Sequence, residues 1–337
     1  MKKFLTVCMS MLAFCGVFSG CGSQSEQSEV SDDQKISIVT TIFPEYDWVR
    51  EIMGDEAENA EITMLLDNGV DLHNYQPTAD DIIKISSCEM FIYVGGESDK
   101  WVEDALAEAT NKDMKVVNLM DVLGDSVREE EIIEGMEGEE HEDDEREEEE
   151  GEDHEHEEIE YDEHVWLSVN NASVLCRHIA DLLCGLDEEH SDVYEANVTA
   201  YMEKLDEMDK AYQDAVEAAS VKTLLFGDRF PFRYLVDDYG LDYYAAFAGC
   251  SAETEASFET IVFLADKVDE LGLSKIMQVE GADGSIARTI RDNTASKDQT
   301  ILTLDSMQAT TMKDAQEGVS YLSIMEKNLD VLKEALA

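Results

Sequence analysis

Two sets of short apolar runs divide the chain, and helical patterns separate the runs within each set. The first set begins after Lys35 with ISIVTTIF and continues through AEITMLL, MFIYVGG and MKVVNLM. The second set consists of VKTLLF, LDYYAAF, KIMQVE and TILTL. Strand-like runs that alternate with helices are typical of parallel sheets. We therefore expect an α/β fold with two lobes, each with a central, mainly parallel four-stranded sheet flanked by helices.

The stretch between the two sets, residues 186–219, predicts one long linking helix. Its large side chains recur at steps of three and four residues, as one helix face requires. They are Tyr194, Val198, Tyr201, Leu205, Met208, Tyr212 and Val216. A coiled-coil dimer is one interpretation, but Tyr and Met at many seam positions favour a helix packed on its own lobes. We expect a monomer with an N-terminal lobe over 36–185 and a C-terminal lobe over 220–337.

The N-terminus has the pattern of an export signal. A basic start precedes an apolar stretch from Phe4 to Phe18, which is short for a membrane span. Ser19-Gly20-Cys21 resembles the lipobox of bacterial lipoproteins, in which the cysteine carries the lipid. This resemblance implies a signal peptide over 1–20, a flexible tether over 21–35 and anchoring at the extracytoplasmic face of the cell membrane. A plain secretory signal is the alternative.

The formal net charge of −55 narrows the range of partners. Nucleic acid is not expected, because phosphate binding requires clustered Lys and Arg. Cations are the natural partners of such a surface. Residues 129–163 hold 23 acidic residues and one arginine. The low-complexity part, 129–160, predicts a disordered loop within the first lobe, and it contains His141, His154 and His156.

Cysteine spacing and common motifs offer little catalytic chemistry. The cysteines beyond the signal, Cys88, Cys176, Cys184 and Cys250, show no CxxC spacing. Cys88, Cys176 and Cys184 lie in apolar contexts and are expected to pack as small hydrophobic residues. The sequence contains no P-loop, GxSxG, GxGxxG or HExxH motif, so hydrolytic and nucleotide chemistry lack a signature.

Several polar residues lie beside predicted strands, where open α/β sheets bind ligands. His73 follows AEITMLL, and His164 precedes VWLSV. Asp228 lies just beyond TLLF, and Asp305 directly follows TILTL. Neutral imidazole binds borderline metals, and carboxylates complete such sites. These residues are therefore candidate metal ligands.

The stretches NGVDLHNYQPTADDI and YDEHVWLSV resemble two motifs of the metal-binding lipoproteins that supply zinc or manganese ABC importers. FPEYDWVREIMGD, GGESDKWVEDAL and YGLDYYAAFAGCSAETEAS extend the resemblance from about Ile36 to the C-terminus. The resemblance implies that His73 and His164 are metal ligands from the first lobe. It also implies that Asp305 occupies the carboxylate position of the second lobe.

The third ligand is where the sequence departs from this family. LLFGDRFPFRY matches the family's ligand-bearing stretch, but Gly227 stands at the expected His or Glu and offers no donor atom. Three protein ligands plus water would suit zinc. Otherwise Asp228, Glu280 or Cys250 could substitute, and Asp228 ranks first because it needs the smallest backbone shift. Each also has an ordinary interpretation: Asp228 as a helix cap, Glu280 as a partner of Arg288, and Cys250 as a packed thiol.

The resemblance implies an extracytoplasmic binding lipoprotein, not an enzyme. It would capture Zn²⁺ between the lobes and deliver it to a permease with its ATPase. A manganese receptor is the alternative within the family, although His141, His154 and His156 favour weak zinc capture by the acidic loop. A surface adhesin or metal buffer would need no permease. A metallohydrolase that uses His73, His164 and Asp305 would need a general base, and no motif supplies one.

Overall fold

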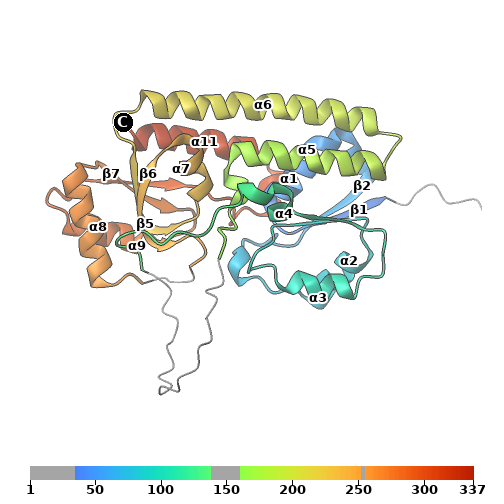
Figure 1. Cartoon of the computed structure of the whole chain (residues 1–337), viewed down its shortest axis with the longest axis horizontal. Coiled ribbons are helices and arrows are strands. Elements are labelled where there is room, and N and C mark those ends of the chain that lie inside the picture. Colours follow the sequence, from blue (N-terminus) through green and yellow to red (C-terminus); the bar gives the residue numbers. More distant parts are fainter. Residues whose placement is uncertain (1–34, 138–159, 252–254) are drawn as a thin grey trace, which may run out of the picture. The chain divides into compact units, whose positions relative to one another are not determined.

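Parallel strands and helices alternate along the chain, as the sequence predicts. The computed structural model describes residues 35–137, 160–251 and 255–337. Strands in these ranges form two four-stranded sheets (Figure 1). Every pairing of neighbouring strands within these sheets is parallel. The predicted α/β class with two parallel sheets is confirmed.

The first sheet has the strand order β2-β1-β3-β4. Its strands are β1 (Ile36–Thr40), β2 (Ala60–Met64), β3 (Met90–Tyr93) and β4 (Lys115–Asn118). Its helices are α1 (Phe43–Met53), α2 (Ala79–Ser87), α3 (Trp101–Ala107) and α4 (Leu119–Leu123), with 3-10 turns η1 (Gly54–Asn59), η2 (Leu72–Asn74) and η3 (Gly124–Ser126). A capping box between Thr78 and Asp81 starts α2. The loop that contains η2 is therefore fixed at both ends, by β2 and by this cap.

The second sheet has the equivalent strand order, β6-β5-β7-β8. Its strands are β5 (Thr223–Phe230), β6 (Asp242–Ala248), β7 (Lys275–Val279) and β8 (Thr300–Leu304). Its helices are α7 (Arg233–Tyr239), α8 (Phe258–Leu271), α9 (Ser285–Asn293), α10 (Met312–Gln316) and α11 (Tyr321–Ala335). The register of β5 against β6 shifts between Phe226 and Arg229. Such an irregularity changes which side chains face a given direction.

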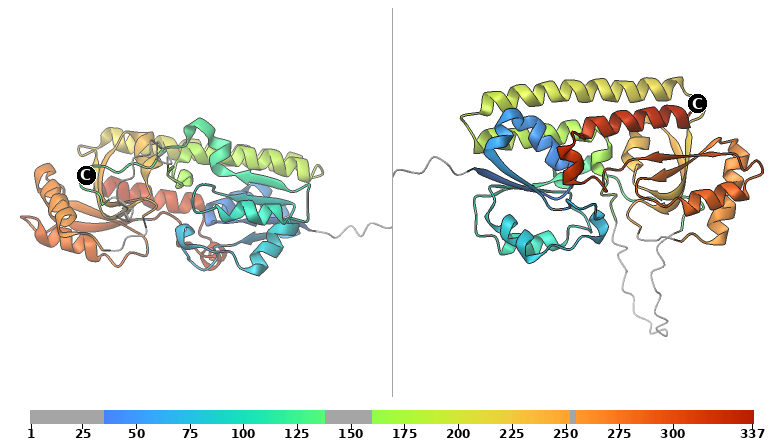
Figure 2. Two further views of the ribbon diagram at one scale, coloured as in Figure 1. Left: turned by 60° about the horizontal axis from the view of Figure 1, so that its bottom comes forward. Right: turned by 180° about the vertical axis from the view of Figure 1, so that it is seen from behind.

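One long helix, α6 (Ser191–Ala218), connects the parts of the chain that form the two sheets. It lies alongside α5 (Val169–Leu186), α1 and α11 (Figure 1, Figure 2). All seven residues of its predicted apolar face are buried, with at most 7% of any of them exposed. Tyr212 adds a hydrogen bond from its hydroxyl to the Met325 carbonyl at 2.7 Å. Helices of the same chain therefore cover the apolar face of α6.

The acidic segment begins with residues that pack on the second sheet. Within 129–137, Glu137 pairs with the edge strand β6 in a parallel bridge. Arg233, which begins α7, forms an ion pair with Glu131. The prediction of disorder over 129–160 within the first lobe is therefore too broad, because backbone partners and a cation hold its first residues against the second sheet.

The cysteines of the described residues are free thiols. The predicted burial of Cys88 and Cys176 is confirmed, whereas Cys184 is partly exposed. The Cys88 thiol also donates to the Ile85 carbonyl at 3.3 Å. These three side chains therefore contribute mainly to packing.

Some predictions concern residues outside the described ranges. Cys21, the signal peptide and nearly all of the tether precede residue 35, and His141, His154 and His156 lie between residues 137 and 160. In the part of the chain that the structure describes, no helix has the length and apolar character needed to cross a bilayer.

Candidate metal centre

Two histidines from separate loops point their rings at each other. His73 lies in η2, where Asp71 Oδ1 accepts a hydrogen bond from the His73 backbone N–H at 3.0 Å. His164 immediately precedes the turn η4 (Val165–Leu167), and Asp162 Oδ1 accepts a hydrogen bond from its backbone N–H at 2.8 Å. The two Nε2 atoms are 3.3 Å apart. The structure thus brings together the two predicted histidine ligands.

Polar partners occupy the other nitrogen of each ring. His164 Nδ1 lies 2.9 Å from Asp162 Oδ1. His73 Nδ1 lies 2.8 Å from Ser98 Oγ and 3.3 Å from Glu163 Oε2. The Ser98 hydroxyl is the hydrogen-bond partner, and the Glu163 oxygen lies close by. With a polar partner beside each Nδ1, the Nε2 atoms are the ring nitrogens that face each other. Metal-binding histidines are held in this way in other proteins.

The separation of the two Nε2 atoms suits one shared ion. Two nitrogens that each lie 2.0–2.1 Å from a tetrahedral zinc ion are about 3.3–3.4 Å apart. The observed distance between the His73 and His164 nitrogens is 3.3 Å. Two lone pairs this close repel each other unless a cation or a proton lies between them. The pair therefore has the geometry of two ligands of a single cation.

A third donor lies beside this pair. One ligand atom from each of His73, His164 and Cys250 lies within 4.8 Å of the other two. Across residues 35–137, 160–251 and 255–337, this is the one such group of His, Cys, Asp or Glu side chains. Cys250 follows β6, and its backbone N–H donates to Glu130 Oε1 at 3.0 Å. Gly249 allows the close approach, because a Cβ there would lie 3.2 Å from the His164 ring.

Buried charges surround the three donors. Burial raises the pKa of Glu163, but the hydrogen bond and the charge of His73 lower it more, and the net pKa lies below the usual value. Burial raises the pKa of the Cys250 thiol well above its usual value, and the charges of Asp162 and Glu130 raise it further. The centre therefore holds negative charge ready to balance a cation, while the thiol by itself keeps its proton.

Asp305 and Glu280, predicted as carboxylate ligands, follow β8 and β7 and bind backbone groups. Ser306 donates to Glu280 twice, from its backbone N–H and its hydroxyl, each at 2.7 Å. Asp305 Oδ1 accepts from the Met307 N–H at 2.8 Å. Burial, followed by the negative charge of Asp305, raises the pKa of Glu280 to about 7. Neither carboxylate belongs to the three-residue group described above.

Asp228, the favoured substitute for the third ligand, has a structural role in β5. Its Oδ1 accepts from the Arg229 N–H at 2.9 Å, and its Oδ2 accepts from the Val279 N–H at 3.0 Å. It thereby ties the irregular part of β5 to β7. Asp228 is also absent from the group formed by His73, His164 and Cys250.

Gly227 faces a helix and not the histidines. A Cβ at this position would lie 2.5 Å from Ala287 Cα and 2.8 Å from Ala287 N, in α9. No side chain fits there without backbone movement. The expectation that Gly227 occupies the family's ligand position is therefore wrong, and the shifted register of β5 is the physical reason.

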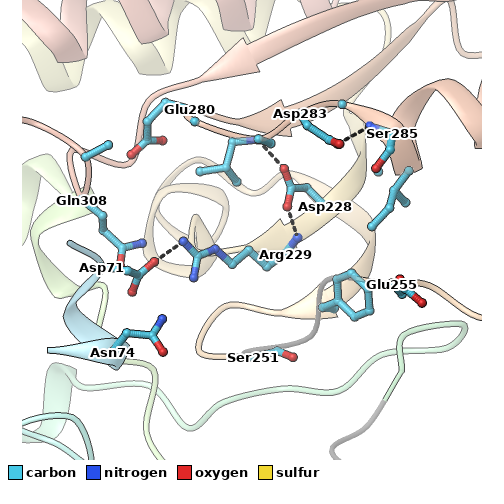
Figure 3. Close-up of a pocket in the computed structure, with 18 of the residues that line it drawn as sticks. Asp71, Asn74, Asp228, Arg229, Ser251, Glu255, Glu280, Asp283, Ser285 and Gln308 are labelled. Atoms are coloured by element: carbon cyan, nitrogen blue, oxygen red, sulfur yellow. Dashed lines mark hydrogen bonds and ion pairs between the residues drawn. The ribbon is translucent and has the colours of Figure 1, made fainter. Parts of the chain in front are cut away.

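A cavity of about 670 Å³ lies next to the centre (Figure 3). Gln308 borders both, because it lines the cavity and its Nε2 is 3.3 Å from His164 Nε2. Acidic side chains dominate the charged lining, and Arg229 forms an ion pair with Asp71 across it. Burial alone would raise the pKa of Asp71, but the Arg229 cation helps to hold it below its usual value. This pair joins the loop that contains His73 to β5 of the second sheet.

Sequence reasoning missed the residues that orient the ligands. Asp162 and Glu163 directly precede His164 in YDEHVWL, and this adjacent acid pair is a signal that could have been used. Ser98 and Glu130 carry no comparable local signal, because they reach the centre from distant parts of the chain.

The fold and the paired imidazoles define the class: a two-sheet α/β protein with a candidate metal centre between loops of both sheets. The chain belongs to the family described as zinc-uptake complex component A, periplasmic, which it matches over residues 38–335. The predicted family is thereby confirmed.

Named relatives of this chain are zinc proteins. The chain is 31% identical to the zinc-binding lipoprotein AdcA of Streptococcus pneumoniae (strain ATCC BAA-255 / R6), over 99% of the chain and 61% of that protein. It is 29% identical to the high-affinity zinc uptake system protein ZnuA of Bacillus subtilis (strain 168), over 98% of the chain and 96% of that protein. The Zn(II)-bound ZnuA-like domain of Streptococcus pneumoniae AdcA superposes with a TM-score of 0.68 at 28% identity, covering 90% of this chain and 99% of that one. The chain thus spans about three fifths of the length of AdcA.

Proposed function

We propose that this protein captures Zn²⁺ outside the cytoplasmic membrane and delivers it to the permease and ATPase of an ABC importer. The observation that carries the proposal is the 3.3 Å separation of the His73 and His164 Nε2 atoms, with both Nδ1 atoms held by polar partners. Such a pair is suited to hold a metal ion, and no catalytic motif accompanies it in the sequence. The protein acts as a receptor for the ion, without catalysis.

Zinc is the proposed ion because of the donor types. Imidazole suits zinc, whereas manganese prefers a site built largely from oxygen ligands. The nearby carboxylates of Glu280 and Asp305 accept hydrogen bonds from backbone N–H groups. The relatives named above as zinc-binding and zinc-uptake proteins support the same choice. A manganese-binding receptor of the same family is the alternative, and Asp305 stays a proposed ligand for either ion.

A lipid at Cys21 would keep the captured ion near the permease. This proposal is based on the sequence Ser19-Gly20-Cys21, which follows an apolar leader. Cell fractionation tests it: the natural protein should sediment with membranes, and Cys21→Ala should move it to the soluble fraction. If both forms sediment equally, the anchor does not depend on Cys21.

Calorimetric zinc titration of the mature protein tests the capture function. His73→Ala and His164→Ala should each abolish the tightest zinc equivalent and its thermal stabilisation, because a ligand that binds the native state stabilises it. His178→Ala, on α5, is the matched control and should bind zinc like the natural protein. Full affinity in either ligand variant, with circular dichroism showing a folded chain, would refute the proposed site.

A further inference from the structure

We propose that Cys250 is the third protein ligand of this centre and that its thiolate makes the site selective for zinc over manganese. The inference rests on the proposed function, since it concerns the same ion. Its basis is geometric: the thiol belongs to the group of three donors that lie within 4.8 Å of one another.

The required movement is small. A tetrahedral zinc ion with Zn–S near 2.3 Å and Zn–N near 2.0–2.1 Å places sulfur about 3.6 Å from each nitrogen. The donor atoms of His73, His164 and Cys250 already lie within 4.8 Å of one another. A contraction of roughly 1.2 Å at most is needed, which a rotation of the cysteine side chain can supply.

Contacts on both sides hold the Cys250 backbone near the histidines. The Cys250 N–H donates to Glu130 Oε1 at 3.0 Å, which fixes the residue to the start of the acidic segment. The preceding Gly249 packs so near His164 that a Cβ would lie 3.2 Å from ring atoms Cε1 and Nδ1. A larger residue at 249 would push the turn away from the ring. The glycine and the Glu130 contact thus bring the thiol to the imidazoles.

The competing carboxylates are less free to bind. Asp228 accepts two backbone hydrogen bonds, and Glu280 accepts two from Ser306. Each would leave a donor without its partner if it moved to a metal, at a cost of about 1–3 kcal/mol. The backbone N–H of Cys250 makes the contact to Glu130 that holds the turn, and the thiol interacts with the Glu163 backbone beside His164. The sulfur of Cys250 can therefore turn to an ion without breaking the hydrogen bond to Glu130.

Binding replaces a proton with the metal. The S–H bond of Cys250 breaks, the proton leaves to the buffer, and the sulfur electron pair forms the Zn–S bond. Thiolate is a soft ligand that favours zinc over manganese. Zinc specificity would then be built into this chain by a residue on the second sheet.

Cobalt substitution provides the test, because a thiolate bound to Co²⁺ produces intense near-ultraviolet charge-transfer absorption. The mature protein loaded with Co²⁺ should show this band, and Cys250→Ser should abolish it while Co²⁺ still binds through the histidines. Zinc affinity of Cys250→Ser should fall by about 100-fold or more, because loss of a direct ligand should cost at least as much as loss of an outer-shell partner, which costs about 10–100-fold. Cys184→Ser, a free thiol on α5, should keep both the band and the affinity.

The outcomes separate the two proposals. Tight zinc binding without the charge-transfer band, or a Cys250→Ser variant with unchanged affinity, overturns the thiolate ligand and leaves zinc capture by the histidines intact. Absence of tight zinc binding in the natural protein refutes both. Cys250→Asp gives a further check, because an oxygen donor at this position should narrow the zinc preference over manganese.

Discussion

The two sheets share one topology but differ in what the loops after their strands offer a metal. The loops of the first sheet place His73 and His164 with their Nδ1 atoms held by polar partners and their Nε2 atoms facing each other. The second sheet places Asp228 within β5 and Glu280 and Asp305 just after β7 and β8, and each of these carboxylates accepts at least one backbone N–H. A polar residue after a strand is thus not sufficient for a ligand. The lone pair must also be uncommitted.

The second sheet therefore contributes differently from the first. Its carboxylates hold its own strands and turns together, and its donor in the three-residue group is the thiol of Cys250, on the turn after β6. Four variants that exchange or remove these roles would test this difference between the two sheets.

Gly227→His should give the largest effect, on stability and not on zinc. A Cβ at 227 would lie 2.5 Å from Ala287 Cα, so α9 must move away from β5. We expect a loss of about 3 kcal/mol or more in the free energy of unfolding, as in severe overpacking. Chemical denaturation measures it. Gly185→Ala is the matched control, because a Cβ there meets no atom within 4 Å, and it should be neutral or stabilising. A folded Gly227→His variant with tighter zinc binding would show that position 227 faces the metal after all.

Asp162→Asn should weaken zinc binding by about 10–100-fold, the usual effect of altering a partner of a metal-binding histidine. Asp162 Oδ1 lies 2.9 Å from His164 Nδ1 and holds the orientation of the ring. Asp187→Asn is a matched control. Asp187 Oδ2 lies 2.7 Å from His190 Nδ1, in the connection between α5 and α6, and neither residue belongs to the three-residue group. Calorimetry should show normal zinc affinity for the control. Equal affinities for both variants would mean that Asp162 only shapes the loop.

Much of the fold was predictable because it depends on local pattern. Each predicted strand run overlaps an observed strand, and the seven large residues of α6 form one buried face. The positions of His73 and His164 were also predictable, because each lies in a short motif whose hydrogen bonds are local: Asp71 binds His73, and Asp162 binds His164.

The second half of the centre was not predictable, because it depends on contacts between distant segments. The register shift in β5 turns Gly227 toward α9, and no residue pattern in LLFGDRFPFRY predicts that shift. The location of Cys250 depends on Glu130, 120 residues earlier in the chain. Composition suggested that Glu130 belongs to a disordered loop, whereas its carboxylate binds a backbone N–H in the folded chain.

Asp228→Ala tests whether the second sheet's carboxylate is structural. Removal leaves the part-buried N–H groups of Val279 and Arg229 without their present acceptor, so we expect a loss of about 1–3 kcal/mol in the free energy of unfolding. Zinc affinity should stay unchanged. Asp283→Ala serves as the control, because Asp283 also accepts a backbone N–H, from Ser285, but at an exposed position. A clear fall in zinc affinity for Asp228→Ala, with normal affinity for Asp283→Ala, would show that Asp228 is a metal ligand.

The smallest effect is expected from the acidic segment itself. Replacing residues 139–158 with a short Gly-Ser linker should preserve the tight zinc equivalent and remove only weaker ones, because the replaced stretch has His and carboxylate donors but few apolar residues. The replacement begins after Glu137, so that Glu130 still accepts the hydrogen bond from Cys250. A second variant, with His141, His154 and His156 changed to Asn, keeps every acid and shows which donor type matters. Calorimetry with excess zinc counts the weak equivalents. If the weak zinc equivalents persist in the linker variant, the replaced segment does not bind them and is only a solvated spacer. If they are lost in the linker variant but persist in the Asn variant, the carboxylates bind zinc without the imidazoles.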